Sequence, residues 1–250
     1  MVRVTHLKVI EFAAHPASYN MALDRRLLGL CEASPDQAFL RFYTWVPPAL
    51  SLGHFEPEGA VDLARAERDG IDVVRRPTGG RIVLHSQDLT YTVVMPREPL
   101  ASVEGTYLEL AQCIVAGLAA LGAKVELARG PLRKSAARVR PCFLSAMRHE
   151  ITNGGRKLVG SAQLVGRRAV LQHGSIPLGR GYLEVVNYLA CGEAEKAALA
   201  QEMAGRTACL EEAVGRVLDP AEVAARLRDA FAAAFGGRVD DGAMSLTDPA

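Results

Sequence analysis

The sequence predicts an α+β fold with a mixed, mostly antiparallel sheet flanked by helices. Three observations support this fold class. Apolar stretches with strand character alternate with amphipathic helices in the first half of the chain. In the second half, the turn signal Asn-Gly-Gly at 153–155 separates two strand-like stretches. The chain becomes helical after Gly181, as expected for helices that pack beside one sheet.

In the first half, the order of elements follows from hydrophobic periodicity. Strands are expected at 6–12, 38–45, 50–55 and 71–76, with a hairpin formed by 81–85 and 89–95 around residues 86–88. Helices are expected at 18–31, 61–68 and 103–121. Gly122 ends the last of these helices, and the two prolines at 47–48 end the strand before them.

The second half begins with the hairpin around 153–155 and a further strand at 169–178. The final helix is defined most clearly, because Asp219 is a good N-cap and Pro220 suits the first helical position. Gly236 is a typical helix end. The expected buried face of this final helix contains Val223, Leu227, Phe231 and Phe235.

Composition excludes several classes of protein. The chain has 250 residues, 49% hydrophobic and 23% charged, which is ordinary for a globular protein. A net charge of +1 gives no indication of a nucleic-acid partner. No apolar run approaches the roughly 18 residues of a membrane span, and the N-terminus lacks a signal-peptide core. We therefore expect a cytoplasmic protein with neither a nucleic acid nor a membrane as partner.

The five cysteines are scattered, odd in number and without a Cys-x-x-Cys pair. This pattern argues against a disulfide framework and against a metal site. Most cysteines are expected to be small packing residues, as on the helices that carry Cys31 and Cys113. Cys142 differs because it follows an irregular basic stretch, and positive charge nearby favours the reactive thiolate. Packing remains the alternative interpretation for Cys142 as well.

The segment RRPTGGRIVLH at 75–85 has the composition of a ligand-binding loop. Gly79 and Gly80 allow close approach of the backbone, and the arginines at 75, 76 and 81 suit an anionic group. An apolar slot could be lined by Ile82, Val83 and Leu84. The predicted ligand therefore has a polar head and an apolar tail. The alternative is a tight Gly-Gly hairpin with solvated arginines, in which His85 is structural.

Lys157 follows the Asn-Gly-Gly turn, where most lysines are solvated surface charges. The small residues Gly160, Ser161 and Ala162 continue the same strand and would leave room for a ligand. The basic stretch 129–141 is bounded by prolines and predicts a loop. We interpret this loop as a docking element for an acidic carrier protein, through Arg138 and Arg140.

Five motifs in order along the chain resemble the lipoate–protein ligase and octanoyltransferase family, which is related to biotin–protein ligases. They are YNMALD (19–24), RFYTWVPPALSLGHFE (41–56), RRPTGGRIVLH (75–85), RKLVGSAQ (156–163) and LQHGSIPL (171–178). The resemblance implies one catalytic domain over residues 1–250, like the class II aminoacyl-tRNA synthetase core, with a short helical extension at about 205–250. The chain has Ser86 where the family commonly has Asp, and Glu56 where Gln is usual.

Two details of the resemblance favour octanoyltransferases of the Gram-positive type. Arg81 stands at the third glycine position of the ligase signature, and Cys142 precedes Lys157 by 15 residues. The resemblance then implies that Cys142 forms an acyl-thioester and that Lys157 stabilises its thiolate. It implies substrate binding by further residues of the motifs and no required cofactor. These residues are Arg76, Thr78, Gly79, Gly80, Arg81, Ile82, Val83, Leu84, His85, Ser161, Ala162 and His173.

The implied partners are octanoyl-acyl-carrier protein as donor and a lipoyl-domain protein as acceptor. The acceptor would be the glycine cleavage H protein or the E2 subunit of a 2-oxoacid dehydrogenase. The first alternative is an ATP- and Mg-dependent lipoate ligase that forms lipoyl-AMP with Lys157 and Arg76, where Cys142 only packs. A second alternative is a non-catalytic acyl-binding module, which the presence of Lys157 disfavours.

Overall fold

The structure is a computed structural model that describes residues 6–97, 102–128, 130, 141–144, 149–236 and 238–242. Its main feature is an eight-stranded sheet in the order β11-β1-β2-β6-β10-β9-β8-β7. β1 pairs in parallel with β2 and β11, and all other neighbours in this sheet are antiparallel. The strands are β1 (His6–His15), β2 (Gln37–Trp45), β6 (Asp88–Pro96), β7 (Glu126–Leu127), β8 (Ile151–Asn153), β9 (Arg156–Val165), β10 (Ala169–Pro177) and β11 (Arg238–Gly242).

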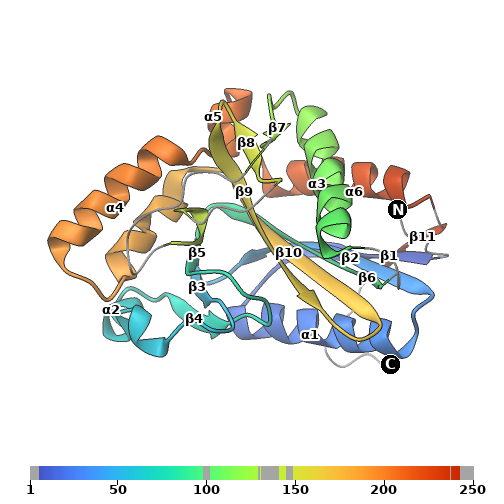
Figure 1. The fold of residues 1–250 in the computed structure, drawn as a ribbon, viewed down its shortest axis with the longest axis horizontal. Coiled ribbons are helices and arrows are strands. Elements are labelled where there is room, and N and C mark those ends of the chain that lie inside the picture. The colour runs from blue at the N-terminus through green and yellow to red at the C-terminus, as the bar shows by residue number, and fades with distance from the viewer. Residues whose placement is uncertain are drawn as a thin grey trace.

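Helices cover both faces of the large sheet (Figure 1). α1 (Ala17–Ala33) lies along one face, and α3 (Val103–Ala119) and α6 (Pro220–Phe235) pack together on the other. Because side chains alternate along a strand, the central strands contribute to a separate core on each side. In β2, for example, Leu40 and Phe42 join the core under α3 and α6, whereas Phe39 packs against α1.

A second, three-stranded sheet lies beside the large one, in the order β4-β3-β5 (Figure 1). Its strands are β3 (Ala49–Leu52), β4 (Asp72–Arg75) and β5 (Val83–His85). The described residues form six further helical segments. These are η1 (Glu58–Ala60), α2 (Leu63–Arg68), η2 (Cys142–Leu144), η3 (Arg180–Tyr188), α4 (Glu193–Arg206) and α5 (Leu210–Val214). Several of them share one apolar core with β3 and β5.

The predicted hairpin of 81–85 and 89–95 is wrong. β5 pairs with β3 in the small sheet, whereas β6 pairs with β2 and β10 in the large one. The turn at Gln87, with a φ of 56°, carries the chain from one sheet to the other. The reason is that the two strands bury their side chains in different cores. Leu84 packs in the core of the small sheet, and Tyr91 packs under α6.

Other expectations are confirmed. The fold is α+β with a mixed, mostly antiparallel sheet and flanking helices. The hairpin of β8 and β9 turns at Gly154 and Gly155, both with positive φ. α6 begins with Asp219 accepting a hydrogen bond from the Ala221 amide, and it ends at Gly236 in the left-handed conformation. The predicted inner face of α6 belongs to the main core, so the described part of the C-terminal segment is integral to the fold.

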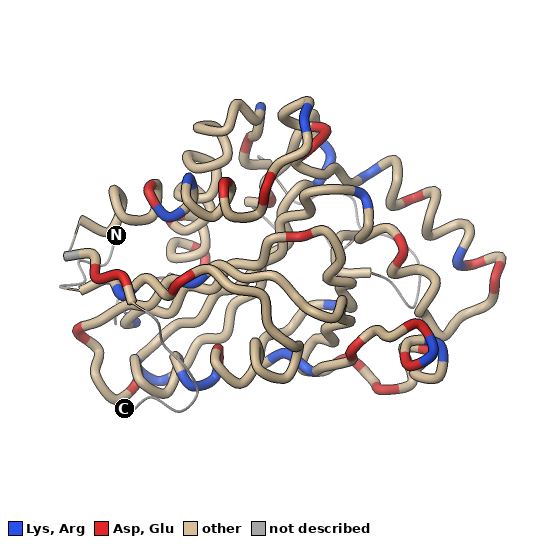
Figure 2. The backbone as a smooth tube through the Cα atoms, turned by 180° about the vertical axis from the view of Figure 1, so that it is seen from behind, with Lys and Arg blue, Asp and Glu red and all other residues tan. Residues whose placement is uncertain are grey.

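Charged residues occur mostly on the helices and connecting loops, and the central strands carry few of them (Figure 2). Within the described residues, no helix combines the length and apolar character needed to cross a membrane.

Candidate active site

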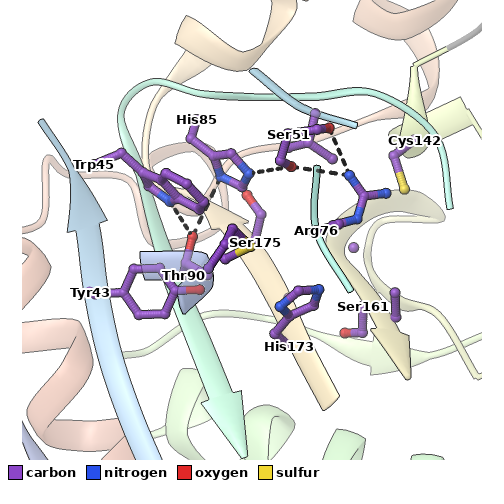
Figure 3. A pocket seen from close by; sticks show the side chains of 15 residues that line it. Tyr43, Trp45, Ser51, Arg76, His85, Thr90, Cys142, Ser161, His173 and Ser175 are labelled. Carbon is purple, nitrogen blue, oxygen red and sulfur yellow. Dashed lines mark hydrogen bonds between the residues drawn. The ribbon is translucent and has the colours of Figure 1, made fainter. Parts of the chain in front are cut away.

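A small cavity opens where the N-terminal half of α1, the small sheet and the middle of β9 and β10 meet (Figure 3). It is lined by Met21, Tyr43, Trp45, Ser51, Arg76, Val83, His85, Thr90, Cys142, Gly160, Ser161, Ala162, His173, Gly174 and Ser175. Its free volume of about 30 Å³ holds on the order of one or two water molecules.

Cys142 reaches this cavity because its backbone is tied to the small sheet. Its amide donates a hydrogen bond of 2.8 Å to the carbonyl of Ile82, next to β5. The following residues, Phe143 and Leu144, are buried in the core of the small sheet. A Cβ atom built on Gly160 would lie 3.5 Å from the Phe143 ring, at ordinary van der Waals distance, so β9 passes close beside η2 at this point.

Arg76 is the buried cation of the cavity. Its side chain is 5% exposed, and it directly follows β4. Among the described residues, every acceptor of a hydrogen bond from its guanidinium is a neutral oxygen. The acceptors are the Ser51 carbonyl at 2.7 Å, the Ser51 hydroxyl at 3.1 Å, the Gly79 carbonyl at 3.0 and 3.2 Å and the Arg81 carbonyl at 2.5 Å. Burial lowers the pKa of Arg76, and the negative charges of Cys142 and Glu56 oppose that shift.

The Gly-Gly turn brings Arg76 and Cys142 together. Gly80 has a φ of 93°, which favours glycine. A Cβ atom at Gly80 would lie 2.7 Å from Arg76 Nη2 and 3.4 Å from Cys142 Sγ. A Cβ atom on Gly53 would lie 2.0 Å from the Gly80 carbonyl oxygen. Side chains at either position would therefore push the loop away from the guanidinium and the thiol.

One chain of hydrogen bonds connects the loop to α1. The Thr78 hydroxyl lies 2.6 Å from His173 Nε2, and His173 Nδ1 lies 3.0 Å from Asp24 Oδ2. Arg41 Nη1 donates to the other Asp24 oxygen at 2.9 Å. Burial lowers the pKa of His173, with Asp24 opposing the shift. Burial alone would raise the pKa of Asp24, but His173 and Arg41 hold it below its ordinary value.

A second chain has the same order of groups. Ser51 Oγ lies 2.8 Å from His85 Nε2, and His85 Nδ1 lies 2.8 Å from Asp88 Oδ2. Asp88 Oδ2 also accepts hydrogen bonds from the hydroxyls of Ser175 and Thr90. The indole of Trp45 stacks on the His85 ring with centroids 4.0 Å apart. Asp88 thus supplies a carboxylate to His85, although Ser86 is the residue that follows the histidine.

Ser161 lies at the β9 side of the cavity. Its Oγ accepts a hydrogen bond of 2.7 Å from the Tyr91 hydroxyl, which in turn accepts one from Gln172. Ala162 pairs with His173 across β9 and β10. The small side chains predicted at 160–162 therefore do line a cavity.

Lys157 lies outside the lining of this cavity. Its side chain is 3% exposed, and its Nζ donates to Glu150 Oε1 at 2.7 Å. The Phe143 ring stands beside it, with its centroid 5.9 Å from Nζ. The role predicted for Lys157 at Cys142 thus stays a prediction, and the lysine and the cysteine are neighbours of the same phenylalanine.

The rest of the predicted binding segment divides into two groups. Ile82 and Leu84 are buried in the core of the small sheet, so only Val83 of the predicted apolar slot lines the cavity. Arg81 is partly exposed and forms an ion pair with Glu56 at 3.4 Å. Thr78, Gly79 and Gly80 position residues next to the cavity but do not line it.

The predicted docking loop at 129–141, with Arg138 and Arg140, falls outside the described residues except at 130 and 141.

Several residues of the site were not singled out from the sequence. The most important are Asp24, Tyr43, Trp45, Ser51, Asp88 and Ser175. Five of them lie within the family motifs, which were therefore the available signal: Asp24 at 19–24, Tyr43, Trp45 and Ser51 at 41–56, and Ser175 at 171–178. Asp88 lies outside these motifs. Among the described residues, no group of three or more His, Cys, Asp or Glu side chains could hold a metal ion.

Comparison with known proteins identifies the family. Residues 16–232 match the model of the lipoyl protein ligase A/B catalytic domain. The chain belongs to this family. It is 37% identical over 243 residues to octanoyltransferase LipM of Symbiobacterium thermophilum, covering 92% of this chain and 85% of the relative. It is 39% identical over 220 residues to octanoyltransferase LipM of Moorella thermoacetica, covering 85% and 80%. The predicted family and the prediction of an acyltransferase are thereby confirmed.

Solved structures confirm the fold. The bipartite lipoate protein ligase of Thermoplasma acidophilum superposes with a TM-score of 0.78 and 18% identity, covering 97% of this chain and 88% of that one. A lipoate–protein ligase A bound with ATP gives a TM-score of 0.74 and 19% identity, covering 97% and 90%.

Proposed function

We propose that this chain transfers an octanoyl group from a thioester donor to a specific lysine of a lipoyl-domain protein, in lipoate assembly. The observation that carries the mechanism is the position of Cys142 in the cavity beside the buried Arg76 guanidinium. A thiolate is the effective nucleophile for an acyl group that is already activated as a thioester. Octanoyltransferases at 37 and 39% identity support this choice of acyl group.

The reaction proceeds in two acyl transfers. The Cys142 thiolate attacks the carbonyl carbon of the donor thioester, the donor carbon–sulfur bond breaks, and the donor leaves as a thiolate that takes a proton. The neutral amine of the acceptor lysine then attacks the enzyme-bound carbonyl. An amide forms, the amine gives up a proton, and Cys142 leaves as a thiolate. No ATP or metal is required in this scheme, because the energy of the donor thioester drives both steps.

The donor is proposed to be octanoyl-acyl-carrier protein, and the acceptor is the glycine cleavage H protein or a 2-oxoacid dehydrogenase E2 subunit. The domain is proposed to extend over residues 1–250. We place the reaction in the cytoplasm, where the five cysteines, all free in the structure, would stay reduced.

Intact-mass spectrometry tests the proposal. Incubation with octanoyl-carrier protein, without ATP, is expected to add one octanoyl group to the enzyme, and Cys142→Ala is expected to abolish both the adduct and the transfer. Cys191→Ser is the matched control, because Cys191 is also a partly exposed thiol but lies outside the cavity. Full transfer by Cys142→Ala contradicts the mechanism. Release of pyrophosphate from ATP and lipoate would instead support ATP-dependent ligation.

A further inference from the structure

We infer that Arg76 is the electrostatic partner that stabilises the thiolate of Cys142, and that the chain Ser51–His85–Asp88 positions Arg76 for this task. The inference deepens the proposed function, because it assigns the activation of the proposed nucleophile to a residue other than Lys157. The activation step is simple: the Cys142 thiol releases its proton to solvent, and the negative charge left on sulfur faces the guanidinium.

The first argument is position. Arg76 and Cys142 line the same cavity, and both side chains reach the point where a Gly80 Cβ atom would be. Figure 3 shows the Cys142 sulfur directed toward the Arg76 guanidinium. Lys157 lies outside the lining of that cavity, where its Nζ forms a buried ion pair with Glu150.

The second argument is charge. Within the described part of the chain, all hydrogen-bond acceptors of Arg76 are neutral oxygens, and no carboxylate there contacts its positive charge directly. The carboxylate of Glu56, which interacts with Arg76 electrostatically, forms its ion pair with Arg81. A buried cation of this kind gains from an anion nearby, and an anion gains equally from the cation. A guanidinium also stays charged across the working pH range, which an ammonium group does less reliably when buried.

The third argument is the direction of the hydrogen bonds. Arg76 Nη1 donates to Ser51 Oγ, so the Ser51 proton is free to point at His85 Nε2, 2.8 Å away. His85 then presents its Nδ1 proton to Asp88. In this series Ser51 and His85 each accept one hydrogen bond and donate one, which holds the Arg76 guanidinium beside the Gly-Gly turn. The stacked Trp45 ring restrains His85 in the same way.

The titratable groups around the thiol come from several elements. Those that line the cavity or interact with Cys142 electrostatically are Tyr43, Arg76, His85, Tyr107 and His173, and those next to Phe143 and Arg76 are Lys157, Glu150 and Glu56. Tyr107, on α3, is a neutral phenol at pH 7, and burial moves its pKa further above that pH. Among these groups, Arg76 combines a permanent positive charge with a place in the cavity lining.

The test is the pH dependence of alkylation of Cys142 by iodoacetamide, followed on its peptide by mass spectrometry. This measurement needs no acyl substrate, so it can fail or succeed independently of the proposed function. Arg76→Met is expected to move the midpoint of the alkylation curve upward by about one to two pH units. Arg76→Lys keeps the charge and is expected to recover at least half of that shift. Lys157→Met is expected to move the midpoint by less than half as much as Arg76→Met.

Arg75→Gln is the matched control. Arg75 also anchors the neighbouring turn, by donating to the carbonyls of Gly53, His54 and Glu56, but it does not line the cavity. If the role of Arg76 were only structural, Arg75→Gln and Arg76→Met would shift the midpoint alike, and Arg76→Lys would not recover it. An unchanged midpoint in Arg76→Met, or a larger shift in Lys157→Met, would also overturn the inference.

A second measurement covers the case in which Arg76→Met does not fold. The melting temperature of the wild-type protein is compared with that of Cys142→Ser between pH 6 and 9. A thiolate stabilised in the folded state adds stability that grows as pH rises through its titration, and serine lacks this contribution. The difference in melting temperature is therefore expected to increase with pH. The same comparison is then made in the Arg76→Lys background, between the protein that keeps Cys142 and the one that also carries Cys142→Ser. There the difference in melting temperature is expected to increase less with pH. An increase as large as in the wild-type background would contradict the role of Arg76.

Discussion

Helices cover both faces of the large sheet, but the strands present different side chains to the two sides. On the side of α3 and α6, β2, β6 and β10 contribute mainly apolar residues, such as Phe42, Tyr91 and Ile176. On the side of α1, the same strands contribute polar residues, among them Arg41, Thr92 and His173, all at most 5% exposed. On the side of α1, the strands therefore hold the candidate site next to a smaller apolar core.

The polar side chains on the side of α1 are held in place by hydrogen bonds to one another as well as by close packing. Asp24 accepts hydrogen bonds from Arg41, His173 and Thr92 without any contact with solvent. Such a network is stable only when all of its members are paired. The apolar face has no such condition, because dispersion contacts and the hydrophobic effect are not directional. Substitutions on the two faces should therefore differ in how much they change the free energy of unfolding, in how this change depends on pH, and in their effect on the site.

The largest effect is expected from Asp24→Ala, which leaves the buried Arg41 guanidinium without its carboxylate partner. Removing one member of a buried pair typically lowers the free energy of unfolding by roughly 3–5 kcal/mol. Urea unfolding followed by circular dichroism measures this change. Asp24→Asn keeps an oxygen acceptor and should lose less. A loss below about 1 kcal/mol for Asp24→Ala would show that the network is not a structural unit.

Leu227→Ala probes the apolar face at a residue of α6 that has no exposed surface. The cavity left behind should lower the free energy of unfolding by roughly 2–5 kcal/mol. The loss should be the same at pH 5 and pH 8, because no titrating group is involved. Arg226→Ala, at the exposed neighbouring position, should change stability by no more than about 0.5 kcal/mol. If the loss of unfolding free energy in Leu227→Ala differed between pH 5 and pH 8, the proposed difference between the two faces would be contradicted.

Gly117→Ala tests how closely α3 and α6 approach each other. The new methyl group would lie 2.7 Å from Leu227 Cδ2 and 2.9 Å from Leu227 Cα. Overpacking of this kind should cost about 1–3 kcal/mol. Gly29→Ala in α1 is the matched control, since no atom lies within 4 Å of its added Cβ. That substitution should instead stabilise the helix by roughly 0.5–1 kcal/mol. Thermal unfolding of both variants gives the comparison, and equal signs would contradict it.

The smallest expected effect is a change of pH dependence in His173→Gln. Burial lowers the pKa of His173 in the folded state. The unfolded chain therefore takes up a proton near its ordinary value of about 6.5 while the folded protein does not, and stability falls as pH drops from there toward the folded pKa. Glutamine has no such proton, so the fall in stability between pH 6.5 and 5 should be shallower. Urea unfolding at several pH values measures the slope, and an identical slope in both proteins would be the contrary result.

Most elements of the fold could be predicted from local patterns, and the exceptions have a common cause. The hairpin at Gly154–Gly155 and the helix that begins after Asp219 carry their own turn and capping signals. The wrongly predicted hairpin around 86–88 had equally strong local signals. The alternation of side chains along a strand does not identify the strand with which it will pair. Only the burial of Leu84 and Tyr91 in different cores separates β5 from β6.

For the site, the family motifs, the unusual cysteine and the Gly-Gly loop with its arginines are visible in the order of residues alone. Which cation lies in the cavity with that cysteine depends on how the chain folds. Arg76 is 66 residues from Cys142 along the chain and Lys157 is 15, yet Arg76 shares the cavity and Lys157 lies outside its lining beside Phe143. The physical reason is that a side chain on a strand points to one side of its sheet, and which side meets a cavity depends on packing partners that are distant in sequence.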